Sequence, residues 1–195
     1  MRSPRAELLA RIAKDDAARA RLAAAGTLWE GYHPELEAIH RANVARLREI
    51  VAELGKWPGR SVVGDDGAAA AWRILQHAIG EPDTMRSLLP LVEAAAAAGE
   101  ADPAHVAMLV DRVCVLEGRA QRYGTQYDWD PDGGDFMVPM VGIDAPDGVG
   151  ARRAAVGLPP LEPRRPPPPD EPPPTDRAAR AREMEAWARG VGWRR

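Results

Sequence analysis

The chain has 195 residues, a formal net charge of −3 and 45 % hydrophobic residues, a balance typical of one soluble globular domain with some residues left over. No basic excess indicates a nucleic-acid partner. No stretch approaches the roughly 18 apolar residues of a membrane span. The first residues also lack the apolar core of a signal peptide. We therefore expect a cytoplasmic protein without a membrane partner.

Helical patterns fill the first part of the chain. Ser3 is a suitable N-cap with Pro4 behind it, and this first helix should end at Gly26. A second helix is expected from about 34 to 54, with an apolar stripe along one face. His40 and Asn43 fall on that stripe, so they should point inward or toward a cleft.

Three more helices follow, separated by short connections. Residues 55–64 read as a loop because of their glycines and proline, and the third helix should start near Asp65 or Asp66. Asp83 or Thr84 can cap a fourth helix, and Asp102 a fifth that Gly118 stops. Five helices joined in this way predict a mainly α protein, a compact helical bundle.

Beyond Gly118 the hydrophobic period changes. Alternating residues over 123–129 and 136–140, around the turn sequence DPDGG, predict a small β-hairpin. Residues 144–161 look irregular, and the proline-rich run that follows should form a polyproline II spacer. We therefore expect a helical domain over 1–161 with a hairpin near 121–140, a linker over 162–174 and a short C-terminal helix over 175–195.

The fifth helix carries an adjacent Asp111-Arg112 pair although it is apolar on several faces. Buried charges are costly unless they are paired, and these two lie about 100° apart on the helix. One interpretation is a structural network, for example Asp111 with Arg19 and Arg112 with Asp15 or Asp16. The alternatives are a cleft in which the same charges hold a ligand or move a proton, and plain surface exposure.

Two histidines are further candidates. His77 follows Gln76 on the third helix, and His40 lies on the second. A lone histidine is more often a packing residue, but neutral imidazole can act as a general acid or base. Both could instead bind a metal ion with Asp111 as third ligand, although no HxxxH or HxH spacing supports this. We expect no metal and no cofactor, since nucleotide-loop, GxSxG and HExxH motifs are missing.

The single cysteine, Cys114, lies in an apolar sequence. It cannot form an intramolecular disulfide. A buried, inert thiol is favoured over a nucleophile, because apolar burial raises the pKa of a thiol.

Several short motifs together resemble an uncharacterised bacterial family, the domain of unknown function 6624. The family pattern is D-Q-x-x-R, G-W-P…V-G, A-W…Q-H-A-D, D-R and Q-x-Y-G-T-Q. The matching positions include Asp15, Arg19, Trp57, Pro58, Gly64, Trp72, Gln76, His77, Asp111, Arg112, Gln121, Tyr123, Gly124, Thr125 and Gln126. The resemblance spans about 8–161, with Arg153 and Gly157-Leu158-Pro159 matching a final R…GLP.

The resemblance brings no established reaction, and the chain departs from the pattern at positions that bear on function. Asp16 replaces the usual Gln, Ile79 replaces the Asp after Q-H-A, and Arg86 stands where Gln is common. Lys56 interrupts the G-W-P. If the family uses those groups, activity in this chain should be altered or lost. The proline-rich tail and last helix look like an addition.

The leading hypothesis is a small enzyme that uses acid–base chemistry, hydrolysis for example, on a small polar molecule. Catalysis is assigned to three residues: His77, tuned by Asp111, with Arg112 holding an anionic or carbonyl group. Substrate contacts are expected from Gln76, Gln121, Tyr123, Thr125, Gln126, His40 and Asn43. The competing hypothesis is a non-enzymatic immunity or accessory protein, in which the polar residues lock helix to hairpin and the proline-rich tail binds a protein partner.

Overall fold

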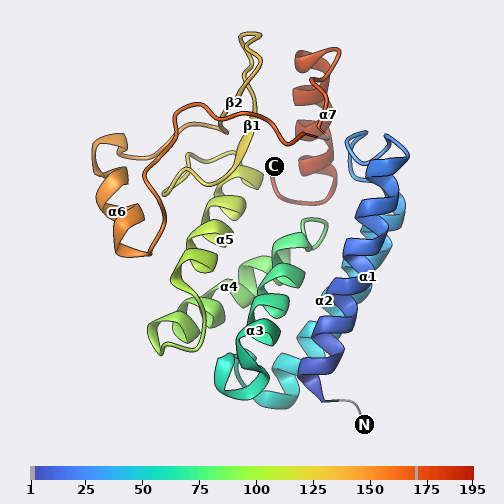
Figure 1. Ribbon diagram of the computed structural model, residues 1–195, viewed down its shortest axis with the longest axis vertical. Helices are drawn as coiled ribbons and strands as arrows, with labels where there is room; N and C mark the ends of the chain where they lie inside the picture. Colours follow the sequence, from blue (N-terminus) through green and yellow to red (C-terminus); the bar gives the residue numbers. More distant parts are fainter. Residues whose placement is uncertain (1–2, 170) are drawn as a thin grey trace. The chain divides into compact units, whose positions relative to one another are not determined.

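The computed structural model describes residues 3–169 and 171–195 (Figure 1). It divides into two compact units, Met1–Val106 and Ala107–Arg195. The described residues form seven α-helices and one two-stranded antiparallel sheet, so the predicted mainly α fold with a small hairpin is confirmed. Within the described ranges, no helix has the length and apolar character needed to cross a membrane.

The first unit contains α1 (Pro4–Ala24), α2 (Pro34–Leu54), α3 (Arg60–His77), α4 (Pro82–Ala97) and the start of α5 (Pro103–Leu116). The starts of α1 and α2 follow from local chemistry. The Ser3 hydroxyl accepts a hydrogen bond from the Ala6 amide at 3.3 Å, and His33 Nδ1 accepts one from Glu35 at 3.2 Å. Each cap satisfies an amide that has no partner within its helix.

The core of this unit lies where α1, α2 and α3 pack together. Its fully buried side chains include Leu8, Leu47, Ile50, Ile74 and Leu75. Burial of each such side chain stabilises the fold by roughly 1.5–3 kcal/mol. The α1 and α2 helices run antiparallel, because polar contacts join Glu7 to Arg46 at one end and Arg21 to Glu35 at the other.

The third helix starts earlier than predicted, but its longer part begins at the predicted position, directly after Gly64. Helix α3 begins at Arg60, within the expected loop, and Gly64 (φ 73°, ψ 170°) interrupts it. The first turn forms because a distant residue caps it: the Glu100 carbonyl accepts from the Arg60 amide, and its carboxylate accepts from the Ser61 amide, both at 2.9 Å. Local sequence does not reveal such a cap.

The second unit contains the rest of α5, then β1 (Tyr127–Trp129), β2 (Met137–Pro139), the 3-10 turn η1 (Pro146–Gly148), α6 (Val149–Ala155) and α7 (Arg177–Gly190). In the hairpin, Tyr127 lies opposite Pro139 and Trp129 opposite Met137. The strands are shorter than predicted, since residues 122–123 form a bend and 124–126 belong to no strand. The part of the tail around Arg165 exchanges two backbone hydrogen bonds with Met137, at 2.9 and 3.0 Å.

The end of the chain contacts the end of α5. The Arg194 guanidinium donates to the carbonyls of Val115 at 2.8 Å and Leu116 at 2.9 Å. These carbonyls belong to the last turn of α5, where a cation is favoured by the helix dipole. The Val115 carbonyl also accepts from the Gly118 amide at 3.0 Å. Trp193, the residue before Arg194, is buried. The last helix is thereby joined to α5 through the residues that follow it.

The break at Gly64 gives a test of the fold. A Gly64→Ala substitution should lower the free energy of unfolding by roughly 1–3 kcal/mol, because its backbone conformation strains any residue with a Cβ. A new Cβ would also lie 3.2 Å from an Asp66 carboxylate oxygen. Urea unfolding followed by circular dichroism measures the change. Gly150→Ala, which meets no atom within 4 Å in α6, is the matched control and should be neutral or stabilising.

Candidate functional site

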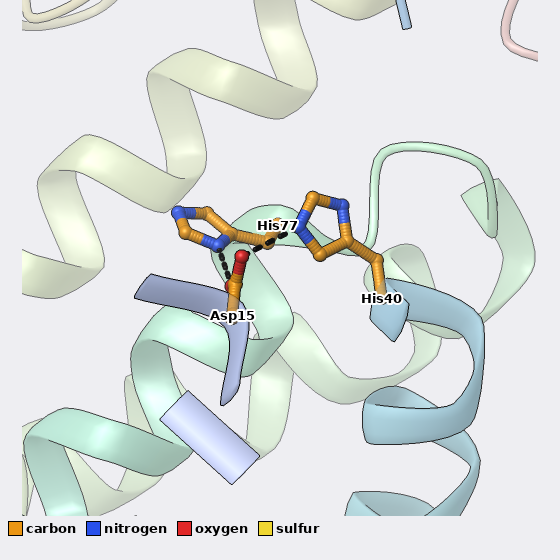
Figure 2. Close-up of side chains that lie close together, drawn as sticks. All are labelled: Asp15, His40 and His77. Carbon is orange, nitrogen blue, oxygen red and sulfur yellow. Dashed lines mark hydrogen bonds and ion pairs between the residues drawn. The ribbon is translucent and has the colours of Figure 1, made fainter. Parts of the chain in front are cut away.

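Three side chains from three helices meet inside the first unit: Asp15 of α1, His40 of α2 and His77 of α3 (Figure 2). One Asp15 carboxylate oxygen lies 3.2 Å from His40 Nε2, and the other lies 2.5 Å from His77 Nδ1. Asp15 and His40 are buried, whereas the His77 side chain is 18 % exposed. The carboxylate therefore bridges two imidazoles, and His77 is the most exposed member of the cluster.

Tyr32 extends the cluster on the His40 side. Its hydroxyl lies 2.9 Å from His40 Nδ1, and its ring stacks on the imidazole with centroids 5.7 Å apart. All these contacts are satisfied together when His40 Nε2–H donates to Asp15 and His40 Nδ1 accepts from the Tyr32 hydroxyl. His77 then donates to Asp15 from Nδ1, which leaves Nε2 as its basic nitrogen.

Electrostatics keep Asp15 ionised. Burial raises the pKa of its carboxyl group, but the hydrogen bonds from His40 and His77 and the charges on those rings lower it more. The net result is a pKa well below the usual value of a carboxyl group. The pKa of Tyr32 is raised, chiefly by burial and then by the nearby Glu37 and Asp15 carboxylates, so its hydroxyl remains a donor at neutral pH.

Gln76 and Asn43 are close in sequence to His77 and His40, and both are predicted to contact substrate. Gln76 precedes His77 on α3 and is buried, and its Oε1 has no hydrogen-bond partner among the described residues. Asn43 lies one turn from His40 on α2 and is also buried; its Oδ1 accepts from Arg11 at 3.3 Å, while its Nδ2 has no partner in the described ranges. The prediction that His40 and Asn43 face inward is confirmed.

Asp111 occupies the second unit and has a different role. Its buried carboxylate accepts four hydrogen bonds from the turn at 122–125. One oxygen receives the amides of Arg122 at 2.7 Å and Tyr123 at 2.9 Å. The other receives the amide and the hydroxyl of Thr125, each at 2.9 Å. This pattern fixes the turn to α5.

The remaining predicted residues of the second unit support the same turn. The buried Gln121 amide group donates to the carbonyls of Gln126 and Met140 and accepts from the Gln126 amide, all at 2.8 Å. The Gln126 side chain donates to the Met108 carbonyl of α5 at 3.3 Å. The buried Arg153 donates to the Tyr123 carbonyl at 2.6 Å. These contacts join helix, turn and hairpin into one polar network.

The predicted set of site residues is therefore distributed over two networks. The carboxylate that hydrogen-bonds His77 is Asp15, for which sequence analysis suggested an ion pair with Arg112. Asp16, the other suggested partner of Arg112, pairs with Arg73. That Arg112 pairs with a carboxylate on another helix stays a prediction. Asp15 could have been found from the sequence, because it shares the buried face of α1 with Leu8 and Ile12, where a carboxylate needs a partner.

Asp15, His40 and His77 are also the residues that could hold a metal ion. Each offers one ligand atom, and these atoms lie within 4.8 Å of one another. Two imidazoles and a carboxylate form a donor set that suits Zn²⁺ or non-haem Fe²⁺. The same atoms, however, make the hydrogen bonds between the imidazoles and the carboxylate, so an ion would have to displace two protons. Asp15, rather than the predicted Asp111, supplies the carboxylate in this set.

A family model matches residues 3–165, which includes the three-residue cluster and the Asp111 network. The chain belongs to DUF6624, a family of unknown function. The DUF6624 match ends before α7, so the last helix lies outside the matched region. No curated protein and no solved structure matches the chain.

The Cys114 thiol is buried, as predicted, and burial raises its pKa. A thiol in this environment is poorly ionised at neutral pH, which disfavours a role as nucleophile.

Replacing Asp15 by Asn should destabilise the first unit by roughly 2–4 kcal/mol at pH 7, because two charge-assisted hydrogen bonds are lost. The Asp15 pKa is lowered on folding, so its contribution is complete above the unfolded-state pKa of about 4 and is lost as pH falls below it. Urea unfolding of wild type and Asp15→Asn at pH 7 and pH 3 measures the difference, which should shrink at pH 3. An equal difference at both pH values would contradict this account.

Replacing Asp111 by Ala should release the turn at 122–125, because three backbone amides lose their acceptor inside the protein. We expect a loss of roughly 3 kcal/mol or more and faster hydrogen exchange at the amides of residues 122, 123 and 125. Asp128→Ala, in β1, is a comparison in which those three amides should keep their protection.

Proposed function

We propose that the protein is a small enzyme in which His77 acts as the general acid–base group on a small polar molecule, in a hydrolysis-like reaction. The observation that carries the proposal is the 2.5 Å contact between His77 Nδ1 and the buried Asp15 carboxylate. A carboxylate at this position orients an imidazole, fixes its tautomer and stabilises the imidazolium that forms when Nε2 takes a proton. Asp15 takes the tuning role that sequence analysis assigned to Asp111.

His40 and Tyr32 form the rest of this hydrogen-bond network around Asp15. They occupy the other Asp15 oxygen and so prevent the carboxylate from rotating away from His77. In a hydrolytic step, His77 Nε2 would remove a proton from water as the oxygen attacks the substrate, and would then return the proton to the leaving group. The buried amides of Gln76 and Asn43, each with one unpaired polar atom among the described residues, are suited to orient the substrate.

The competing proposal, a non-enzymatic interaction protein, draws its support from the second unit. There the Asp111 carboxylate and the Gln121 amide group are occupied by internal hydrogen bonds. This is the pattern that a structural network requires. We accordingly assign Asp111, Gln121 and Gln126 to the stability of the second unit, and keep the tail as the candidate contact for a protein partner.

Turnover of a panel of chromogenic esters, amides and phosphate esters tests the enzyme proposal. His77→Gln and Asp15→Asn should each lower kcat/KM by roughly 10²–10⁴-fold, since both remove the oriented base. The control is His33→Asn, which keeps a side chain able to cap α2 and should retain full activity. Addition of EDTA should leave the rate unchanged, because the proposed step uses protons only.

Two results would contradict the enzyme proposal. One is turnover that survives in His77→Gln at the wild-type rate. The other is a panel without any substrate whose turnover exceeds that of buffer, combined with normal folding of the protein by circular dichroism.

A further inference from the structure

A groove of about 580 Å³ lies between α1 and α2, outside the Asp15–His40–His77 cluster. It exists because small side chains face each other there: Ala10 from α1, and Ala38 and Ala42 from α2, contribute only methyl groups to its lining. The groove also contains Arg11, Lys14 and Asn43. Arg11 is one helical turn from Asp15, and Asn43 is one turn from His40, so the groove follows the same two helices as the cluster.

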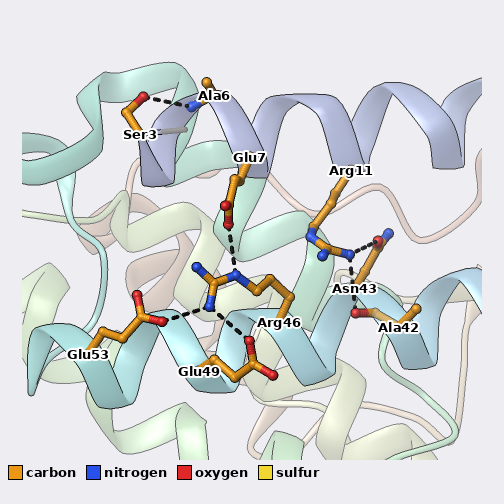
Figure 3. A network of polar contacts seen from close by, with 9 residues as sticks. All are labelled: Ser3, Ala6, Glu7, Arg11, Ala42, Asn43, Arg46, Glu49 and Glu53. Carbon is orange, nitrogen blue, oxygen red and sulfur yellow. Dashed lines mark hydrogen bonds and ion pairs between the residues drawn. The ribbon is translucent and has the colours of Figure 1, made fainter. Parts of the chain in front are cut away.

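Among the described residues, the cations of the groove have no carboxylate partners. Arg11 Nη1 donates to the Ala42 carbonyl at 3.2 Å and to Asn43 Oδ1 at 3.3 Å, and both of these acceptors are neutral (Figure 3). Lys14 has no ion pair within the part of the chain that the structure describes. A guanidinium bound only to neutral oxygens keeps most of its capacity to bind an anion.

The acidic residues of the groove lie at its two ends, and each is paired with an arginine. Glu7 accepts a hydrogen bond from Arg46 at 2.8 Å, and Glu35 pairs with Arg21 (Figure 3 shows the Glu7 end). Arg46 also binds Glu49 and Glu53, which lie outside the groove lining. The middle of the groove therefore carries two cations, and each end carries a carboxylate that an arginine holds.

Asn43 is a buried polar residue of the groove lining. It is 3 % exposed, it lines the groove, and Figure 3 shows it rising from α2 toward Arg11. With Oδ1 committed to Arg11, its Nδ2 is a buried donor that has no partner among the described residues. An unpaired buried donor is costly to stability, so its retention in a native protein calls for an explanation.

We propose that the groove binds the carboxylate or phosphate group of a small organic anion, between Arg11 and Lys14. The guanidinium supplies parallel N–H donors and the ammonium adds a second charge, which is the chemistry that recognises either group. The methyl groups of the alanines accommodate the uncharged part of the molecule. As an account of the substrate class, this proposal rests on the proposed function, because the groove would anchor a molecule whose reacting part reaches His77.

NMR titration of the full chain with inorganic phosphate and with acetate, at constant ionic strength, tests whether the groove binds anions. At least one anion should shift the side-chain signals of Arg11 and Asn43 saturably. The anion that causes the larger shifts shows whether the groove prefers a phosphate or a carboxylate group. Arg11→Gln should weaken this binding about tenfold or more, since a charge-assisted contact is lost. Lys14→Gln should weaken it by a smaller factor, and Arg11→Lys should keep part of the affinity.

The matched control is Arg48→Gln, which removes an equal charge from an exposed position of α2 outside the groove lining. Unchanged affinity in this variant supports the proposal. The proposal is overturned if neither anion binds saturably, or if Arg48→Gln weakens binding as much as Arg11→Gln.

His77→Gln should bind the anion like wild type, so anion binding without any turnover would reject the enzyme and keep the groove. Turnover with an unchanged KM in Arg11→Gln would reject the groove and keep the enzyme.

Discussion

The buried carboxylate of Asp15 is the constraint on which the first unit depends. An ionised carboxyl group without exposure to water is tolerated only when charge and hydrogen bonds compensate for its lost hydration. Here two imidazoles from two other helices provide that compensation, one at each oxygen. The requirement ties α1, α2 and α3 to a single point. It also holds His77 in the orientation that acid–base chemistry needs, so the same contacts serve stability and the proposed function.

The second unit uses a buried carboxylate for a different purpose. Asp111 binds backbone amides rather than imidazoles, and so shapes the turn at 122–125. A carboxylate that accepts four hydrogen bonds has little capacity left for a substrate. The contrast between Asp15 and Asp111 separates the candidate site from the structural network, although both lie in the region that the DUF6624 family model matches.

The helices could be predicted from the sequence largely because their caps are local. Ser3 and Pro4 mark the start of α1, and Asp102 marks the start of α5 with a 2.8 Å contact to the Ala104 amide. The start of α3 could not, because Glu100 caps it from a distant position in the chain. The extent of the hairpin was overestimated for a related reason. Alternation of polar and apolar residues around Tyr123 resembles a strand, but the hydrogen bonds of Asp111 bend that segment into a turn.

The candidate site was only partly predictable. The stripe on α2 correctly placed His40 and Asn43 inside, but the partner of His77 depends on how three helices pack, which one sequence does not specify. In this arrangement, Asp15 receives Nδ1–H from His77 and Nε2–H from His40. Long-range ¹H–¹⁵N NMR of the histidine rings at neutral pH measures these protonation sites directly. We expect a proton on Nδ1 of His77 and on Nε2 of His40. A His77 ring that carries its proton on Nε2 alone would contradict it.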